Sequence, residues 1–362
     1  MSSRWAEVDL GAIAHNLRHL QSLQEPGTRV LAVVKANAYG HGARAVARAA
    51  LDAGAWGLAV STLEEAGELR DLCPPERILA MGGLLPGDAG FAAATGVAVT
   101  CFSLDVARAL AAAAQERGVA VPVHLKVDTG MGRLGVQPEA ALELARFVAG
   151  AGSLRLAGVF THFAASDTDP EFTAQQADRF RRLLGQLEEA GINPGLRHAG
   201  NTGGALRGVS FDAVRLGIGL YGCEAPGTKP ALQLRALLVQ VKTVEPGESV
   251  GYGRTWRAER ATPVATVTLG YADGVFRARG NRGDVLVRGR RARLIGRVSM
   301  DMVTLDVSGI PDVRPGDVAT FIGADGEERI TAEAVAEWSD TISYEVLTAI
   351  GRRVERRYPL AE

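Results

Sequence analysis

Eight short apolar runs, most of them separated by amphipathic stretches of helical period, are the feature that most constrains the fold of this chain. They lie at residues 30–35, 57–61, 77–82, 97–101, 121–128, 156–163, 196–200 and 214–219. Such runs are typical of strands buried on both faces, and helical connections favour parallel strands. Eight alternating units over about 200 to 250 residues predict an α/β fold built on a parallel (β/α)8 TIM-type barrel.

Helical patterns fill the connections at residues 10–23, 43–53, 62–72, 104–117, 139–149 and 171–190. We expect Asp9 to cap the first of these helices. An open, doubly wound sheet is the alternative to the barrel. Its usual marker is a Gly-x-Gly-x-x-Gly loop after the first strand, and the first loop here reads Asn-Ala-Tyr-Gly-His-Gly instead.

The pattern changes after about residue 230, where strand-like runs are joined by turn pairs such as Pro-Gly with little helix between them. We expect residues 11–228 to form the barrel and residues 229–362 to form a mainly β domain, which the N-terminal strand at residues 1–10 joins. The runs of this second domain lie at 234–244, 262–270, 284–288, 292–298, 302–307 and 317–322.

Charge and composition argue against several classes of function. The formal net charge is -1 and no long run of like charges occurs, so we expect no nucleic-acid partner. No segment reads as a signal peptide or a membrane span, which leads us to expect a cytoplasmic protein. Cys73, Cys101 and Cys223 are widely separated and lack metal-ligand spacing, so we expect neither a disulfide framework nor a metal site.

Lys35 ends the first buried run, where an unpaired ammonium is unfavourable. A lysine chosen at random would more often extend its ammonium to solvent. Of the 40 Lys and Arg residues, however, only Lys35, Lys126, Lys229 and Lys242 are lysines. Arginine cannot supply a neutral amine for a Schiff base, so a lysine at this position suggests catalysis.

Polar residues recur at the carboxyl ends of the predicted barrel strands, which meet at one mouth. Glycines after the last two strands are typical of phosphate sites, because their backbone can approach a ligand closely. A phosphate site facing a strand-end lysine indicates pyridoxal 5'-phosphate as the cofactor. The residues of this set are Lys35, Tyr39, Lys126, Arg133, His162, His198, Asn201, Thr202, Arg215 and Gly217.

At these residues the chain closely resembles the alanine racemase family. Residues 32–42 (Ala-Val-Val-Lys-Ala-Asn-Ala-Tyr-Gly-His-Gly) are similar to its cofactor-lysine signature. Further matching segments lie in order at residues 126–135, 161–163, 198–202, 215–218, 250–253, 269–274, 296–302 and 342–345. The chain departs from the usual family residues at Thr202 and Ser299, and both positions keep a small polar group.

The resemblance implies a racemase that interconverts L-alanine and D-alanine and supplies D-alanine for bacterial cell-wall peptidoglycan. It implies that Lys35 carries the cofactor and handles the α-proton on one face, while Tyr271 does so on the other. A tyrosine has an unperturbed pKa near 10 and needs a cationic neighbour to act as a base, a role that falls to His162 and Arg215. Arg215 is also implied to contact the pyridine nitrogen.

The remaining roles are likewise implied by the resemblance. Arg133 is implied to contact the phenolic oxygen of the cofactor and to bind the substrate. Met300 and Asp301 are implied to contact the substrate carboxylate. The residues implied to contact the cofactor or to line the site are Tyr39, Asn201, Thr202, Gly217, Ile218 and Tyr344. A carbamylated Lys126 beside Arg133 is an option that the sequence leaves open. A homodimer whose sites are shared between chains is also implied.

Three alternatives fit less well. A racemase of another small amino acid such as serine differs in substrate by one hydroxyl, which an apolar pocket rejects only weakly. The second alternative is an amino-acid decarboxylase of the same fold, and the third is a catalytically idle carrier of the cofactor. The Gly-Tyr-Ala-Asp-Gly segment at residues 270–274 favours the racemase.

Overall fold

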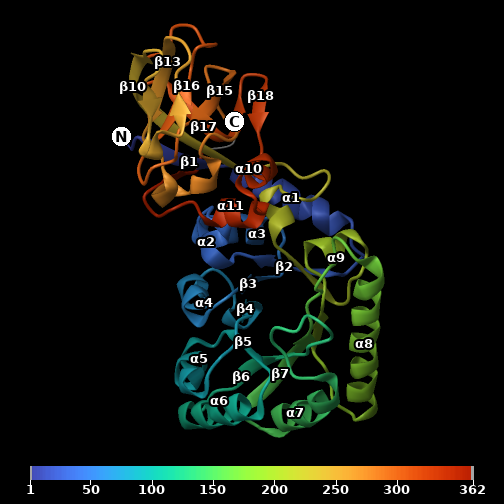
Figure 1. The fold of residues 1–362 in the computed structure, drawn as a ribbon. Coiled ribbons are helices and arrows are strands. Elements are labelled where there is room, and N and C mark those ends of the chain that lie inside the picture. The colour runs from blue at the N-terminus through green and yellow to red at the C-terminus, as the bar shows by residue number, and fades with distance from the viewer. Residues whose placement is uncertain (1, 360–362) are drawn as a thin grey trace. The chain divides into compact units, whose positions relative to one another are not determined.

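A closed parallel barrel forms the first part of the chain in the computed structural model, which describes residues 2–359 (Figure 1). Its strands close in the order in which they occur, and β9 returns to β2 with Arg215 opposite Leu31. The predicted (β/α)8 barrel is therefore confirmed. The strands are β2 (Arg29–Val33), β3 (Gly57–Val60), β4 (Ile78–Ala80), β5 (Ala98–Cys101), β6 (Val121–Lys126), β7 (Leu154–Phe160), β8 (Leu196–His198) and β9 (Ala213–Leu216).

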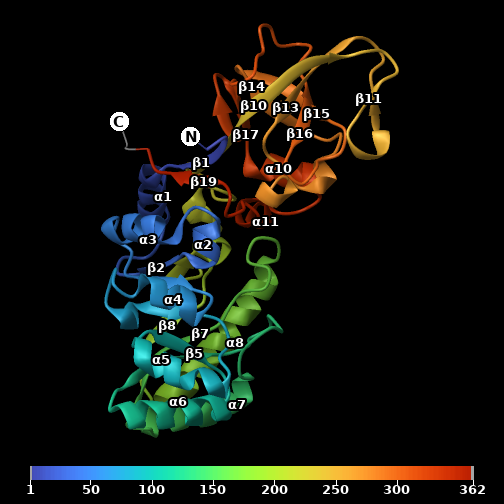
Figure 2. The ribbon, with the colours of Figure 1, turned by 90° about the vertical axis from the view of Figure 1, so that its left-hand side faces the viewer.

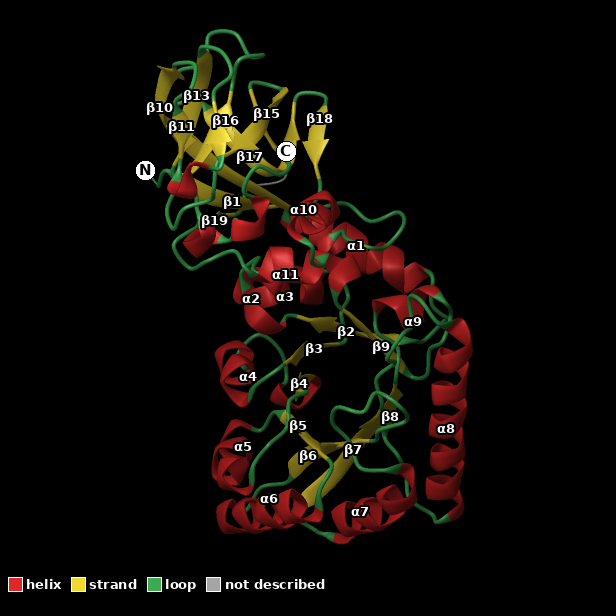
Figure 3. Ribbon diagram, viewed as in Figure 1, coloured by secondary structure: helices red, strands yellow, loops and turns green. Residues whose placement is uncertain are grey.

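Helices surround these strands, as Figure 3 shows by colour. They are α1 (Leu10–Ser22), α3 (Ala43–Asp52), α4 (Leu63–Leu69), α5 (Ala89–Thr95), α6 (Leu104–Arg117), α7 (Pro138–Gly150), α8 (Pro170–Glu189) and the short α9 (Thr202–Leu206). The side chains of Ser103 and Asp169 cap α6 and α8. The Asp9 carboxylate accepts from the backbone N–H of Ala12 at 2.9 Å, as predicted.

The left-handed conformation of the turn that follows β2 was not predicted. The segment α2 (Lys35–Tyr39) contains Ala36, Asn37 and Ala38 with φ of 52°, 54° and 52°. Tyr39 continues the turn with φ of 51°. Residues other than glycine avoid this left-handed region because Cβ crowds the following carbonyl, at roughly 1–2 kcal/mol per residue. The sequence lacks glycine here, so local propensity gave no sign of such a turn.

A mainly antiparallel sheet dominates the second part of the chain (Figure 2). Its nine strands run in the order β18-β17-β14-β15-β16-β13-β10-β1-β19, and β10 pairs with both β13 and β17. The predicted mainly β region is confirmed. The strands are β1 (Arg4–Val8), β10 (Leu232–Val244), β13 (Thr262–Val267), β14 (Asp284–Val287), β15 (Arg290–Ile295), β16 (Val303–Asp306), β17 (Val318–Asp325), β18 (Glu328–Ile330) and β19 (Glu355–Arg357).

Several shorter elements of this region were not predicted. A two-stranded ribbon joins β11 (Ser249–Val250) to β12 (Trp256–Arg257). The helices α10 (Ala332–Ser339) and α11 (Ser343–Thr348) follow the sheet strands β17 and β18. Three short 3-10 turns are η4 (Tyr252–Arg254), η5 (Tyr271–Asp273) and η6 (Arg277–Arg279).

The chain packs as two compact units. The barrel unit comprises residues 13–38 and 43–228, and the β unit comprises the described residues up to Ala12, Tyr39–Gly42 and those from Lys229 onward. The β unit includes β1 because this strand pairs antiparallel with β10 and parallel with β19. Among residues 2–359, no helix has both the length and the apolar character that crossing a membrane requires.

Asp273 anchors three segments of the β unit. Its side chain is completely buried, and it accepts from Arg4 at 2.7 Å and from the Nε of Arg353 at 3.0 Å. It also accepts from the backbone N–H of Gly270 at 3.1 Å. Asp301 binds the same Arg353 at 2.8 Å but is exposed. One buried carboxylate therefore joins β1, the η5 turn and the segment before β19.

We expect Asp273→Asn to destabilise the β unit by about 3 kcal/mol, because removing one partner of a buried ion pair leaves the other partners uncompensated. Asp301→Asn is the matched control, since it removes an exposed carboxylate from the same arginine and should cost less than about 1 kcal/mol. Calorimetry of each variant measures the shift. Equal shifts in the two variants would contradict this account of Asp273.

Candidate active site

Eight of the predicted site residues belong to the barrel unit, and each follows or ends a barrel strand. Lys35 follows β2, Arg133 lies in the loop after β6, His162 follows β7, and Arg215 lies on β9. The others are Asn201 and Thr202 after β8 and Gly217 and Ile218 after β9. Parallel strands that close into a barrel place these ends at one mouth.

Lys35 is half-buried, and its pKa is lowered from the ordinary value. Burial is the main cause, followed by the positive charge of Arg133, and Arg215 adds to the effect. The Glu65 carboxylate acts in the opposite direction. A lowered pKa increases the fraction of neutral amine, which is the form that reacts with a carbonyl carbon.

Lys126 is a second lysine of the barrel interior and is almost fully buried. Burial and the charges of Arg215 and Arg133 lower its pKa to about 8, against a smaller opposing effect of Asp128. Its Nζ lies 5.3 Å from the centre of the Phe160 ring, so part of its charge is met by an aromatic face. The mouth is therefore strongly cationic.

Arg215 is buried and hydrogen-bonds to neutral groups. One guanidinium nitrogen contacts Nδ1 of His198 at 2.8 Å. The other donates to the carbonyl oxygens of Ala199 at 2.7 Å and Thr161 at 2.8 Å, and contacts Nδ1 of His162 at 3.1 Å. Burial lowers the pKa of Arg215 to about 9, so the group still carries its charge at neutral pH.

The imidazoles next to Arg215 form a directed chain. Because arginine only donates, Nδ1 of His198 must accept, and the His198 proton lies on Nε2. That proton points to Nδ1 of His124, 2.9 Å away. Burial lowers the pKa of His124 to about 3 and the pKa of His198 well below its usual range. Both rings are therefore neutral.

His124 was missed by the sequence-based assignment of site residues. It is buried on β6 two residues before Lys126. Two polar side chains inside one buried strand are the signal that could have identified it, because buried polar groups require partners. A sequence alone does not show which partner a buried histidine meets.

The ends of β8 and β9 are tied together by one hydroxyl. Oγ1 of Thr202 accepts from the backbone N–H of Gly217 at 3.2 Å and of Gly219 at 3.4 Å. Its own O–H has no acceptor among the described residues. Asn201 caps the following turn, because its Oδ1 accepts from the N–H of Gly204 at 3.0 Å. The Thr202 hydroxyl can therefore donate to a ligand oxygen.

This set of groups fits pyridoxal phosphate. The cofactor is anionic and carries an aldehyde, and the mouth offers several cations, a hydroxyl donor and an amine with a lowered pKa. The residues that could hold it are Lys35, Arg133, Thr202, Arg215 and their neighbours. Within residues 2–359, no group of three or more His, Cys, Asp or Glu side chains is arranged to hold a metal ion.

The other predicted site residues belong to the β unit. The rings of Tyr39 and Tyr344 lie 6.0 Å apart, and burial raises the pKa of Tyr39 to about 12. Tyr271 donates its backbone N–H to Ser299 at 3.0 Å, directly before Met300 and Asp301 in the chain. These residues thus form two groups, the tyrosine pair Tyr39 and Tyr344 and the turn that joins Tyr271 to residues 299–301.

Tyr252 was not assigned a role from the sequence. Its side chain is 73% exposed, against 44% for Tyr271. It lies between Gly251 and Gly253, with φ of 72° and 71°, which lets a tight turn project the ring. A Cβ added to Gly253 would lie 3.4 Å from Nε of Arg297, so a guanidinium borders this turn.

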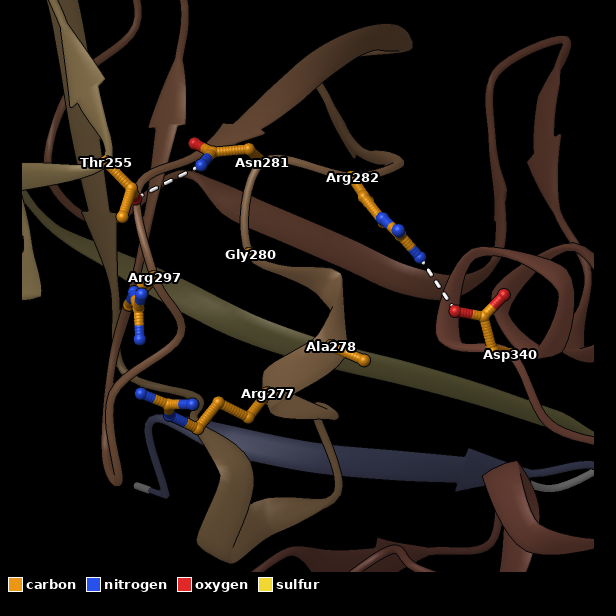
Figure 4. A pocket seen from close by; sticks show the side chains of 8 residues that line it. All are labelled: Thr255, Arg277, Ala278, Gly280, Asn281, Arg282, Arg297 and Asp340. Carbon is orange, nitrogen blue, oxygen red and sulfur yellow. Dashed lines mark hydrogen bonds and ion pairs between the residues drawn. The ribbon is translucent and has the colours of Figure 1, made fainter. Parts of the chain in front are cut away.

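A cavity of about 450 Å³ lies in the β unit beside this turn (Figure 4). None of the predicted site residues lines it. Arg277 and Arg297 extend into the same space, while Arg282 is paired with Asp340 at 2.8 Å. The remaining lining residues are Thr255, Ala278, Gly280 and Asn281. This region is therefore rich in cations as well.

Comparison with known proteins agrees with this geometry. The chain matches the family models for the alanine racemase N-terminal domain at residues 8–225 and the C-terminal domain at residues 231–358. Curated alanine racemases from Desulforamulus reducens and Desulfovibrio desulfuricans are 43% and 41% identical to it, with coverage of 98% of this chain in both and of 98% and 97% of those proteins.

Solved structures agree as well. The crystal structure of alanine racemase from Streptomyces lavendulae, a D-cycloserine producer, superposes with a TM-score of 0.94 at 38% identity and covers 100% of this chain and 98% of its own. The Bacillus anthracis enzyme with bound L-Ala-P has a TM-score of 0.92 at 36% identity, covering 99% of this chain and 96% of its own.

Two family models over nearly the whole chain, together with full-length relatives, establish what the geometry indicated. The chain belongs to the alanine racemase family, pyridoxal-phosphate enzymes that interconvert L-alanine and D-alanine.

Proposed function

We propose that Lys35 binds the cofactor covalently and is one of two bases that move the α-proton of alanine. The observation that carries this proposal is the lowered pKa of Lys35, caused by burial and by the charges of Arg133 and Arg215. The family's general role is to supply D-alanine for peptidoglycan. Pyridoxal phosphate, when bound, withdraws electrons from the α-carbon and so acidifies its proton.

Arg215 is proposed as the partner of the pyridine nitrogen. It keeps its protons at neutral pH and can therefore donate a hydrogen bond without transferring a proton. Its imidazole neighbours His198 and His162 are neutral and accept from it, which fixes the orientation of the guanidinium. Limited charge withdrawal into the ring favours return of the proton to the α-carbon, which is what racemisation needs.

The other residues are proposed to position cofactor and substrate. Arg133 faces the phenolic oxygen of the cofactor and the substrate, and Met300 and Asp301 meet the substrate carboxylate. Contacts to the phosphate or the walls of the site come from Tyr39, Asn201, Thr202, Gly217, Ile218 and Tyr344. The free Thr202 O–H and the cationic surroundings support this assignment.

Racemisation requires a second base, because the proton must return to the face opposite the one that lost it. The sequence led us to Tyr271. The geometry of the β unit supports Tyr252 more strongly, since its ring is more exposed and its turn borders the guanidinium of Arg297. We therefore propose Tyr252 as the second base and Tyr271 as a residue that lines the site.

Borohydride reduction of the yellow holoenzyme should fix the cofactor to Lys35, because this amine combines a strand-end position with a lowered pKa. Peptide mass spectrometry after proteolysis locates the label. Lys229 and Lys242 on the β unit are internal controls and should remain unlabelled. A label on Lys126 would reassign the cofactor to the other buried lysine.

Tyr252→Phe should lower the rate of L-to-D conversion by about 100-fold or more, because loss of a general base costs about 10² to 10⁴ in rate. Tyr271→Phe should cost less than about tenfold. Both variants should retain full cofactor content, measured from visible absorbance. The reverse order of the two rates would return the role of second base to Tyr271.

We further propose a homodimer in which each active site combines residues of both chains. Lys35 belongs to the barrel unit, and Tyr252 and Tyr271 belong to the β unit. A closed two-fold dimer makes two equivalent shared sites. The resemblance to the alanine racemase family implies the same homodimer with shared sites.

Mixed dimers test the shared site. One subunit carries Lys35→Ala and the other carries Tyr252→Phe, with different affinity tags to isolate the mixed species. If sites are shared, one site holds both lesions and the other holds neither, so activity should return to about half the wild-type value per dimer. Two inactive homodimers and an inactive mixed dimer, confirmed by mass, would show that each chain builds its own site.

Two coarser proposals accompany these roles. We propose that the domains divide near residue 229 and that strand 1–10 belongs with the second, in line with the packing of β1 on β10. We also propose a cytoplasmic location. The free thiols of Cys73 and Cys101 support a reducing compartment.

A further inference from the structure

The turn after Lys35 is strained and must be held by its surroundings. Four successive residues, from Ala36 to Tyr39, have φ between 51° and 54°, and none of them is glycine. Such conformations persist only where neighbouring contacts over-determine them. The backbone N–H of Ala38 donates to the carbonyl of Val34 at 2.9 Å. Side chains add further contacts.

Glu65 contacts this turn from the next βα unit. Its Oε1 accepts from the backbone N–H of Ala36 at 2.7 Å. Its Oε2 accepts from the N–H of Ser61 at 2.7 Å and of Thr62 at 3.3 Å. The two oxygens of one half-buried carboxylate thus join the loop after β2 to the start of α4.

A helix cap alone does not require this arrangement. In the capping box of α4, Oγ1 of Thr62 accepts from the N–H of Glu65 at 3.2 Å, and Glu65 needs only one oxygen to complete the box. The second oxygen meets the first N–H of the left-handed turn. A hydrogen bond from N–H to a carboxylate is among the stronger ones in proteins.

We propose that Glu65 is a positioning residue for Lys35, whose carboxylate holds the left-handed turn on which the lysine sits. The proposal rests on the proposed function of Lys35. Glutamine cannot replace it, because its amide has a single oxygen and can serve either Ala36 or Ser61 but not both. Aspartate keeps the charge but is one methylene shorter, so it cannot span the two sides.

The charge of Glu65 provides a second, weaker effect. Glu65 raises the pKa of Lys35 and so opposes Arg133 and Arg215. Removing the charge should lower the pKa of Lys35 further. In the direction in which Lys35 accepts the α-proton, it must be neutral. The acid limb of the kcat profile, which reports groups of the enzyme–substrate complex, should therefore move to lower pH in Glu65→Gln.

Hydrogen exchange of the Ala36 amide in the holoenzyme, resolved by mass spectrometry, tests whether the Glu65 carboxylate holds the turn. We call this contact the Glu65 clamp. Exchange should accelerate at least about tenfold in Glu65→Gln and in Glu65→Asp, because the bond to the carboxylate is lost. Glu64→Gln is the matched control, since it removes the same charge from the same turn of α4 without a contact to Ala36. Thr62→Val weakens the helix cap and should leave Ala36 exchange unchanged.

The pH profile of kcat distinguishes the two effects of Glu65, which are its hydrogen bonds to the turn and its negative charge. The acid limb should move to lower pH in Glu65→Gln and should not move in Glu65→Asp or Glu64→Gln. Unchanged Ala36 exchange in both Glu65 variants, or equal acceleration in Thr62→Val, would overturn the proposal. A different result is faster Ala36 exchange in the Glu65 variants with an acid limb that moves in none of them. It would refute Lys35 as the base but would leave the role of Glu65 in holding the turn intact. Failure of the proposed function and failure of this inference are therefore distinguishable.

Discussion

The active site depends on burying the Arg215 guanidinium among neutral acceptors. Its hydrogen bonds go to carbonyl oxygens and imidazole nitrogens, so its charge is solvated but not cancelled. That charge lowers the pKa of Lys126 and contributes to the lowered pKa of Lys35. A carboxylate in place of the imidazoles would remove this effect, because opposite charges raise the pKa of nearby amines. The barrel mouth is therefore cationic because the hydrogen-bond acceptors of Arg215 are neutral.

The neutral imidazoles are a consequence of the same burial. A protonated His198 would place two positive charges within 2.8 Å of each other in an environment from which water is excluded. Burial instead holds the ring neutral, and its proton is directed towards His124. The chain Arg215, His198, His124 therefore has one orientation of donors, which fixes the position of the guanidinium inside the barrel.

Backbone strain in the turn after Lys35 is the second constraint. A left-handed turn of four non-glycine residues costs several kcal/mol at roughly 1–2 kcal/mol each. The β3–α4 connection offsets part of this cost through Glu65, whose carboxylate accepts from the N–H groups of Ala36, Ser61 and Thr62. Strain of this kind is common at functional sites. In the β unit, Asp273 has a comparable role as a buried carboxylate that joins distant segments.

The sequence by itself determined the barrel, the mainly β region and the strand-end position of Lys35, because strands buried on both faces leave short apolar runs and amphipathic helices leave a period of 3.6. It also indicated the cofactor through Lys35 and the glycines near Thr202 and Gly217. It did not predict the left-handed turn, His124, the clamp by Glu65 or the exposure of Tyr252. These depend on side chains from separate segments meeting in space, and the energy that selects them, such as a carboxylate offsetting strain in another loop, has no local signature in the chain.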